Sequence, residues 1–146
     1  MAIIKEKRIT VESVIEDLDA SGLSDTAEKC RNEYDAFLKI TDGELVISYC
    51  EMNEGGRTVT DLTVTEECIT VSRRGGIESD FRFSEGRVER SLYKMPPYEF
   101  DAEISTVKIR NNLTRVGGDL LIFYDMTLGG AKRRVRMKVS VPRDGA

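Results

Sequence analysis

The sequence of 146 residues contains no histidine. Without histidine, the Ser-His-Asp and Cys-His arrangements of nucleophilic catalysis are excluded, and so are zinc sites with histidine ligands. The side chain that usually moves protons near neutral pH is also missing. We therefore expect a protein that is not an enzyme, and no motif in the sequence calls for a cofactor.

Cysteine and long apolar runs are also scarce. Cys30, Cys50 and Cys68 are spaced about twenty residues apart, which fits neither a disulfide framework nor closely spaced zinc ligands. We expect them to be reduced and mostly buried. No run approaches the roughly 20 apolar residues of a membrane helix, and Met1 to Arg8 lacks the apolar core of a signal peptide. The sequence thus predicts a cytoplasmic protein that does not associate with membranes.

The charge balance is slightly acidic, with 22 basic and 26 acidic residues and a net charge of −4. A chain with this balance has no excess positive field to hold a phosphate backbone, so nucleic acid is not an expected partner. The composition is otherwise that of a globular protein, with 40% hydrophobic and 33% charged residues. The length predicts one domain that spans residues 1–146.

The clearest pattern runs from Phe81 to Arg110. Two alternating runs are separated by Ser84-Glu85-Gly86, and a Pro96-Pro97 corner separates the second run from a third. Alternation with a period of two places every second side chain on one face of a sheet. Beyond Ile104 the apolar positions change from even to odd numbers, which indicates a β-bulge near Ser105 and Thr106.

The rest of the chain repeats this pattern. Thr41-Asp42-Gly43 is a hairpin signal, followed by a return strand from Leu45 to Cys50, and Arg73-Arg74-Gly75-Gly76 is predicted as a turn. Residues from Glu16 to Thr26 have turn and cap chemistry, with room for one helical turn at most. About ten strands with hairpin-length connections predict an all-β, antiparallel up-and-down barrel of 8–10 strands. A Greek-key sandwich is the alternative.

The segment from Gly86 to Phe100 resembles the signature of the YwiB-like family, through Ser91, Tyr93, Pro96 and Tyr98. Ile47-Ser48-Tyr49 and the order of the strands are also similar to that family. The resemblance implies a small bacterial protein with a calycin-like (lipocalin-like) β-barrel. It implies no activity and no catalytic residue.

Calycin-type barrels often bind apolar carboxylic acids through an inward arginine and tyrosine, so the resemblance nominates several residues for ligand binding. They are Arg90, Tyr93, Tyr98, Arg110 and Tyr124, and Phe81, Phe83 and Tyr124 are expected to surround an apolar tail. The two faces of the predicted strand from Arg87 to Lys94 are almost equally polar, so the pattern leaves open which face points inward. The expected ligand is small and apolar or anionic.

The alternative is a barrel filled by its own side chains, which serves as a structural or protein-interaction module. Its working surface would be the outward basic row Lys132, Arg134, Arg136 and Lys138. A second copy of the chain, in a homodimer, is one partner that the sequence leaves open. The carboxylates of Glu99, Asp101 and Glu103 alternate with apolar residues, which indicates the solvated face of a strand rather than a metal site.

Overall fold

The computed structural model describes residues 2–21, 24–53 and 55–144, and its regular structure consists of ten strands. The strands are β1 (Ile3–Leu18), β2 (Ser24–Thr41), β3 (Glu44–Asn53), β4 (Gly56–Val64), β5 (Ile69–Gly75), β6 (Glu78–Phe83), β7 (Val88–Met95), β8 (Tyr98–Asn111), β9 (Gly118–Leu128) and β10 (Ala131–Val141). The described residues contain no helix long and apolar enough to cross a membrane.

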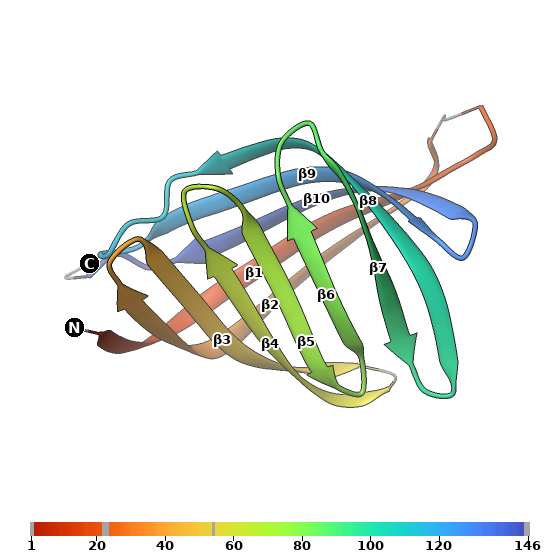
Figure 1. Ribbon diagram of the computed structural model, residues 1–146. Coiled ribbons are helices and arrows are strands. Elements are labelled where there is room, and N and C mark those ends of the chain that lie inside the picture. The colour runs from red at the N-terminus through yellow and green to blue at the C-terminus, as the bar shows by residue number, and fades with distance from the viewer. Residues whose placement is uncertain (1, 22–23, 54, 145–146) are drawn as a thin grey trace.

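Each strand pairs antiparallel with its neighbours in the sequence, and β1 also pairs with β10, so the sheet closes into a barrel (Figure 1). The closing register runs from Thr10↔Ser140 to Asp17↔Arg133. The predicted up-and-down barrel of 8–10 strands is therefore confirmed, with ten strands among the described residues, and the Greek-key alternative is excluded because every connection joins adjacent strands. Closure leaves no first or last strand without a neighbour. Along β2, however, the described residues before Phe37 pair with β1 alone, and β6 pairs with β7 only at Glu78↔Lys94 and Ser79↔Tyr93.

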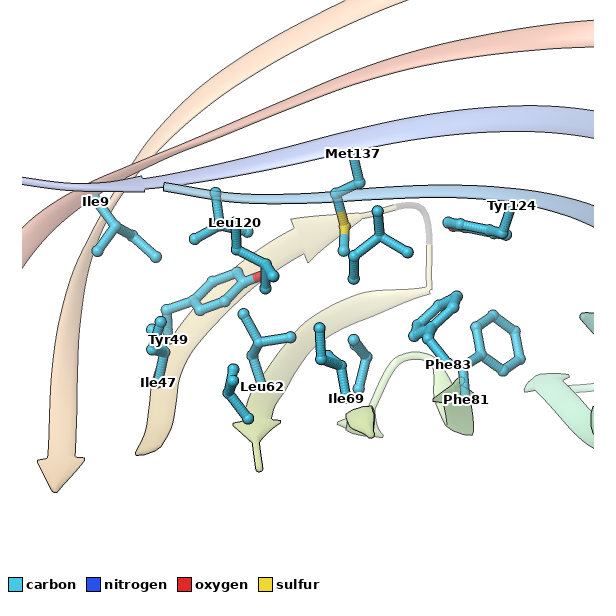
Figure 2. Packing of buried hydrophobic residues seen from close by; sticks show 14 of the residues in the cluster. Ile9, Ile47, Tyr49, Leu62, Ile69, Phe81, Phe83, Leu120, Tyr124 and Met137 are labelled. Atoms are coloured by element: carbon cyan, nitrogen blue, oxygen red, sulfur yellow. The ribbon is translucent and has the colours of Figure 1, made fainter. Parts of the chain in front are cut away.

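The barrel is filled from its inner face. Every strand except β7 contributes at least one buried apolar residue, such as Ile9 of β1, Leu62 of β4 and Ile122 of β9. These side chains alternate with exposed or half-buried ones, as the predicted period of two requires. Figure 2 shows the side chains of opposite walls meeting inside the barrel. A polar residue is therefore surrounded by protein when its side chain belongs to the inward row of its strand.

The predicted bulge is confirmed, since the β8–β9 register shifts between Thr106 and Lys108. Val107 is the extra residue, and it is 62% exposed rather than part of the core. The open question about β7 is also resolved. Its odd-numbered residues Ser91 and Tyr93 are half-buried, whereas its even-numbered residues Arg90 and Leu92 are exposed.

Two other predictions were wrong. The segment from Glu16 to Thr26 is mainly strand rather than turn, because β1 and β2 keep pairing as far as Leu18↔Ser24; residues 22 and 23 lie outside the described residues. The cysteines are free as expected, but none is buried and Cys50 is exposed. Cys50 occupies an outward position between the inward Tyr49 and Glu51 of β3.

The start and the end of the described chain are joined by ion pairs. Asp144 accepts hydrogen bonds from the ammonium groups of Lys5 and Lys7 on β1, and Lys5 also donates to the backbone carbonyl of Arg115 at 2.8 Å. The hydrogen bonds from Lys5 and Lys7 lower the pKa of the Asp144 carboxyl below its usual value. These contacts hold β1 against the segment that follows β10.

We expect the Asp144→Asn variant to have a lower free energy of unfolding than the wild type at pH 7. A lowered carboxyl pKa adds stability above the pKa of the unfolded chain, and that stability is lost as the pH falls through the folded-state pKa. The difference in urea midpoint between the two proteins should therefore shrink as the pH falls below the usual carboxyl pKa of 3.8. Asp101→Asn, at an exposed carboxylate without an ion pair in the described chain, is the control and should change little at either pH. A difference independent of pH would contradict this account.

Candidate functional site

The inward rows change from apolar to polar toward one end of the barrel. On β4, Leu62 and Val64 are preceded in the inward row by Thr58 and Thr60, which are also buried. On β5 the same row ends at Arg73. The turns from β3 to β4 and from β5 to β6 lie at this end and touch backbone to backbone, since a Cβ on Gly55 would lie 2.4 Å from the Gly76 carbonyl oxygen. We call this region the polar end of the barrel.

An ion pair lies in the barrel wall at the polar end. The Nε of Arg73 donates to Oε1 of Glu51 at 3.3 Å, and the two side chains are only 20% and 22% exposed. The hydroxyl of Thr60 donates to the same Glu51 oxygen at 2.5 Å. The carboxylate is therefore held from two sides, and it fixes the position of the arginine. The two terminal amino groups of Arg73 have no hydrogen-bond acceptor among the described residues.

Three tyrosines surround this ion pair. The rings of Tyr34 and Tyr49 lie 4.8 Å apart between centroids, and Tyr124 packs on Phe83 at 4.7 Å. Burial is the main cause of a raised pKa at all three hydroxyls; the charge of Glu51 adds to the effect at Tyr34 and Tyr49, and the charge of Arg73 opposes it. All three therefore remain protonated at neutral pH and can donate a hydrogen bond.

The pKa of Arg73 shows the balance of these charges. Burial lowers the pKa of the guanidinium, but Glu51, Tyr49 and Tyr124 together outweigh it, and the net shift is upward. A buried guanidinium is tolerated only when charge and hydrogen bonds compensate for its lost hydration. Arg73 is therefore a permanent positive charge at the inner face of the barrel.

Buried polar atoms without partners lie near this charge. Among the described residues, Ser79 Oγ, Asn53 Oδ1 and Thr106 Oγ1 are buried and accept or donate no hydrogen bond. Ser79 is directly opposite Arg73 in the register of β5 and β6, and Thr106 is opposite Tyr124 in the register of β8 and β9. Each unsatisfied group of this kind costs about 1–3 kcal/mol, so a water molecule or a ligand that bonds to these groups would stabilise the protein.

The five residues predicted to bind a ligand do not come together. Tyr93 and Tyr124 lie inside the barrel: Tyr93 stacks on Phe81 at 6.2 Å, and Figure 2 shows Tyr124 directed inward beside Phe83. Arg90 is on the outer face, with an 84% exposed side chain that lies 3.5 Å from Glu103. The five predicted residues therefore do not form one site inside the barrel.

Tyr98 and Arg110 are also outside, for different reasons. Tyr98 has the parity of the inward residues of β8, but it lies at the first position of the strand, where it is 61% exposed and stacks on Phe100 at 6.5 Å. Arg110 follows the bulge at Val107, which reverses the parity of the strand and turns this side chain outward. Arg73, which is not one of the five predicted residues, is instead an arginine in the inward row of its strand, β5.

Arg73 and Glu51 were missed because the predicted strands were too short. The prediction ended the third strand at Cys50 and assigned Arg73 to a turn, whereas β3 continues to Asn53 and β5 to Gly75. The signal was present in the alternation, because Ile69, Val71 and Arg73 share one parity, as do Ile47, Tyr49 and Glu51. Extending each run by two residues would have placed both charges inside.

Comparison with known proteins agrees with this architecture. The fold and the position of the polar end define a small closed up-and-down barrel with a charged, mostly buried arginine, Arg73, on its inner wall. The chain belongs to the family described as "Domain of unknown function (DUF1934)", whose model matches residues 9–138.

The uncharacterised β-barrel protein YwiB of Bacillus subtilis (strain 168) is 29% identical over 119 residues, which cover 82% of this chain and 80% of YwiB. The crystal structure of ywiB protein from Bacillus subtilis superposes with a TM-score of 0.76 at 24% identity and covers 94% of each chain. The predicted membership of the YwiB-like family and the predicted barrel are both confirmed.

A double-mutant cycle tests the ion pair. We expect Arg73→Met to lower the free energy of unfolding by about 1–3 kcal/mol, because it leaves the mostly buried Glu51 carboxylate without its cation. Combining it with Glu51→Gln should recover part of this loss, and urea unfolding at pH 7 measures all four proteins. Arg74→Met is the matched control, since Arg74 is the next residue on the same strand and pairs with Asp80 on the exposed outer face.

The control should cost less than about 1 kcal/mol, as exposed ion pairs do. If Arg73→Met and Arg74→Met lower the free energy of unfolding equally, and the double variant recovers none of the loss, the two arginines lie in the same environment. That result would contradict the mostly buried ion pair between Arg73 and Glu51.

Proposed function

We propose that this protein is a non-catalytic binding protein whose barrel holds a small molecule with an anionic group, and that Arg73 is the anchor for that group. The observation that carries the proposal is a mostly buried guanidinium that donates from Nε alone among the described residues. An arginine has five N–H donors, so four remain for a ligand. Two parallel N–H groups match the two oxygens of a carboxylate.

The charge of Glu51 does not remove this capacity. Its single contact to Arg73 is at 3.3 Å through Nε, and Thr60 shares the same oxygen. Glu51 therefore orients the guanidinium and leaves the two terminal amino groups to the ligand. The hydroxyls of Tyr49 and Tyr124 donate to no acceptor in the described chain, and their raised pKa values keep them protonated as additional donors. An anion at Arg73 would satisfy groups that the protein alone leaves unpaired.

The apolar part of the ligand would lie against the aromatic side chains next to Arg73. Phe81, Phe83 and Tyr124 are buried near Arg73, and Tyr93 extends the aromatic wall by stacking on Phe81. A carboxylate attached to a short apolar or aromatic group fits this sequence of polar and apolar surfaces. The close packing of the remaining interior favours a small ligand over a long chain.

Binding is favoured over catalysis by the chemistry of the same residues. The chain has no histidine, and Arg73 and the protonated tyrosines do not exchange protons near neutral pH. Within the described ranges, no group of three or more aspartate, glutamate or cysteine residues is placed to hold a metal ion. The residues around Arg73 can bind and orient an anion, and they do not supply a nucleophile with an activating base.

Binding of benzoate and of its uncharged counterpart benzyl alcohol tests the proposal. Isothermal titration calorimetry on the purified wild-type protein should show binding of benzoate and at least about tenfold weaker binding of benzyl alcohol, since the anchor is an ion pair. Tyr49→Phe and Tyr124→Phe, which keep the ring and remove only a hydroxyl, should each weaken benzoate binding by roughly threefold to tenfold.

Arg73→Lys should weaken benzoate binding by at least about tenfold, because an ammonium group cannot form the two parallel hydrogen bonds. Arg74→Lys is the matched control and should leave the affinity unchanged. Native mass spectrometry of the wild-type protein as purified should also detect a bound small acid. Benzoate binding that Arg74→Lys weakens as much as Arg73→Lys, or no binding of either compound, would overturn the proposal.

A further inference from the structure

The outer face of β8, β9 and β10 forms a trough that is separate from the barrel interior. The cavity along it has a volume of about 450 Å³, and its lining includes Val107, Lys108, Arg110, Phe123, Arg134 and Arg136. The side chains of these residues belong to the outward rows of their strands. None of these six residues takes part in the anion site proposed at Arg73. The lining also includes Asp125 and Tyr124, and the Tyr124 side chain is directed into the barrel and belongs to that site.

The strand register explains the shape of the trough. Phe123 of β9 is directly opposite Lys108 of β8 on one side and Arg136 of β10 on the other. One step along, Leu121 is opposite Arg110 and Lys138 in the same way. The floor is therefore an apolar strip on β9, and the two walls are rows of cations about 10 Å apart, which is twice the spacing between neighbouring strands.

The cations on the walls are not all neutralised. Arg134 pairs with Asp125 at 3.1 Å, and Arg136 lies 3.9 Å from Glu16. Lys108 and Arg110 are exposed and have no carboxylate partner among the described residues. The bulge in β8 contributes to this positive charge, because it turns Lys108 outward together with Val107. A positively charged strip of this kind, on a chain with a net charge of −4, is a local departure from the average charge of the molecule.

We infer that this trough docks an extended acidic segment of another protein, in which apolar side chains alternate with glutamate or aspartate. In an extended segment, successive side chains point to opposite faces, so one set faces the sheet and the alternate set faces away from it, where the long lysine and arginine side chains of the two walls can reach it. The apolar set would cover Leu121 and Phe123, and the carboxylates would pair with Lys108, Arg110 and Arg136. The apolar strip consists of Leu121 and Phe123, which are about 7 Å apart at the rise of a β-strand, and Asp119 and Asp125 lie at its two ends. It therefore contacts about three residues of the docked segment.

The test uses a fluorescein-labelled peptide with the sequence Glu-Leu-Glu-Phe-Glu-Leu-Glu and fluorescence anisotropy on the full chain. We expect saturable binding that weakens as the salt concentration rises, because exposed charges are screened over about 8–10 Å at physiological salt. The same peptide with lysine in place of glutamate should not bind. The peptide with serine in place of leucine and phenylalanine should bind at least about tenfold more weakly.

Lys108→Glu combined with Arg136→Glu should weaken binding of the acidic peptide by at least about a hundredfold, since it reverses the charge of both walls beside Phe123. Lys39→Glu combined with Arg82→Glu is the control, because it changes the net charge equally at exposed positions of β2 and β6 outside the trough. Phe123→Ser should weaken binding while leaving its salt dependence in place. Arg73→Lys should leave peptide binding unchanged, which separates this site from the barrel interior.

Equal weakening by the two charge-reversed pairs, or no binding of the acidic peptide, would overturn the inference. Sedimentation velocity tests whether a second copy of the chain occupies the trough instead. A dimer of the wild type that Lys108→Glu with Arg136→Glu dissociates, without binding of the peptide, would assign the trough to a second copy of the chain and would also overturn the inference.

Discussion

The pairing of β1 with β10 is the constraint on which the rest of the structure depends. Because this pairing closes the sheet, every strand acquires an inner and an outer face, and each residue is assigned to one of them by its parity. Closure also satisfies the backbone groups that an open sheet would leave at its two edges. The interior is then a space of limited size in which any charged side chain needs a partner.

This constraint explains why two adjacent arginines have different roles. Arg73 and Arg74 are neighbours in the sequence, but the first faces the inner wall beside Glu51 and the second faces solvent beside Asp80. The same logic applies on β8, where the single extra residue at Val107 exchanges the inner and outer rows. The bulge thereby sends Lys108 and Arg110 to the outer surface and keeps Ile109 on the inner face. One inserted residue thus determines the charge of the outer trough.

Much of the fold could be predicted from the sequence, because alternation and tight turns are local signals. The hairpin at Asp42-Gly43, the bulge after Ile104 and the outward basic row of the last strand all followed from the order of the residues. The face of β7 could not be predicted, because its two rows are almost equally polar. It is fixed by long-range contacts such as the stacking of Tyr93 on Phe81.

The candidate site was harder to predict for a related reason. Glycines such as Gly75 and Gly76 are strong local signals for a turn. Because of them, the predicted strand ended before Arg73, whereas β5 continues to Gly75. In the folded barrel, pairing with β4 and β6 extends β5 through Arg73, and the ion pair with Glu51 comes from a strand 22 residues away. A charged residue at the end of an alternating run therefore needs to be considered as part of the inner row.

The central claim is that Arg73 is a buried cation with donor groups available to an anion. The most direct measurement is the ¹⁵N NMR spectrum of the arginine side chains, recorded while acetate is added to the protein and assigned with Arg73→Lys. If Arg73 binds an anion, its side-chain signals shift and saturate with acetate while those of Arg74 stay in place. Unchanged Arg73 signals, with shifts only at exposed arginines such as Arg90, would contradict this claim.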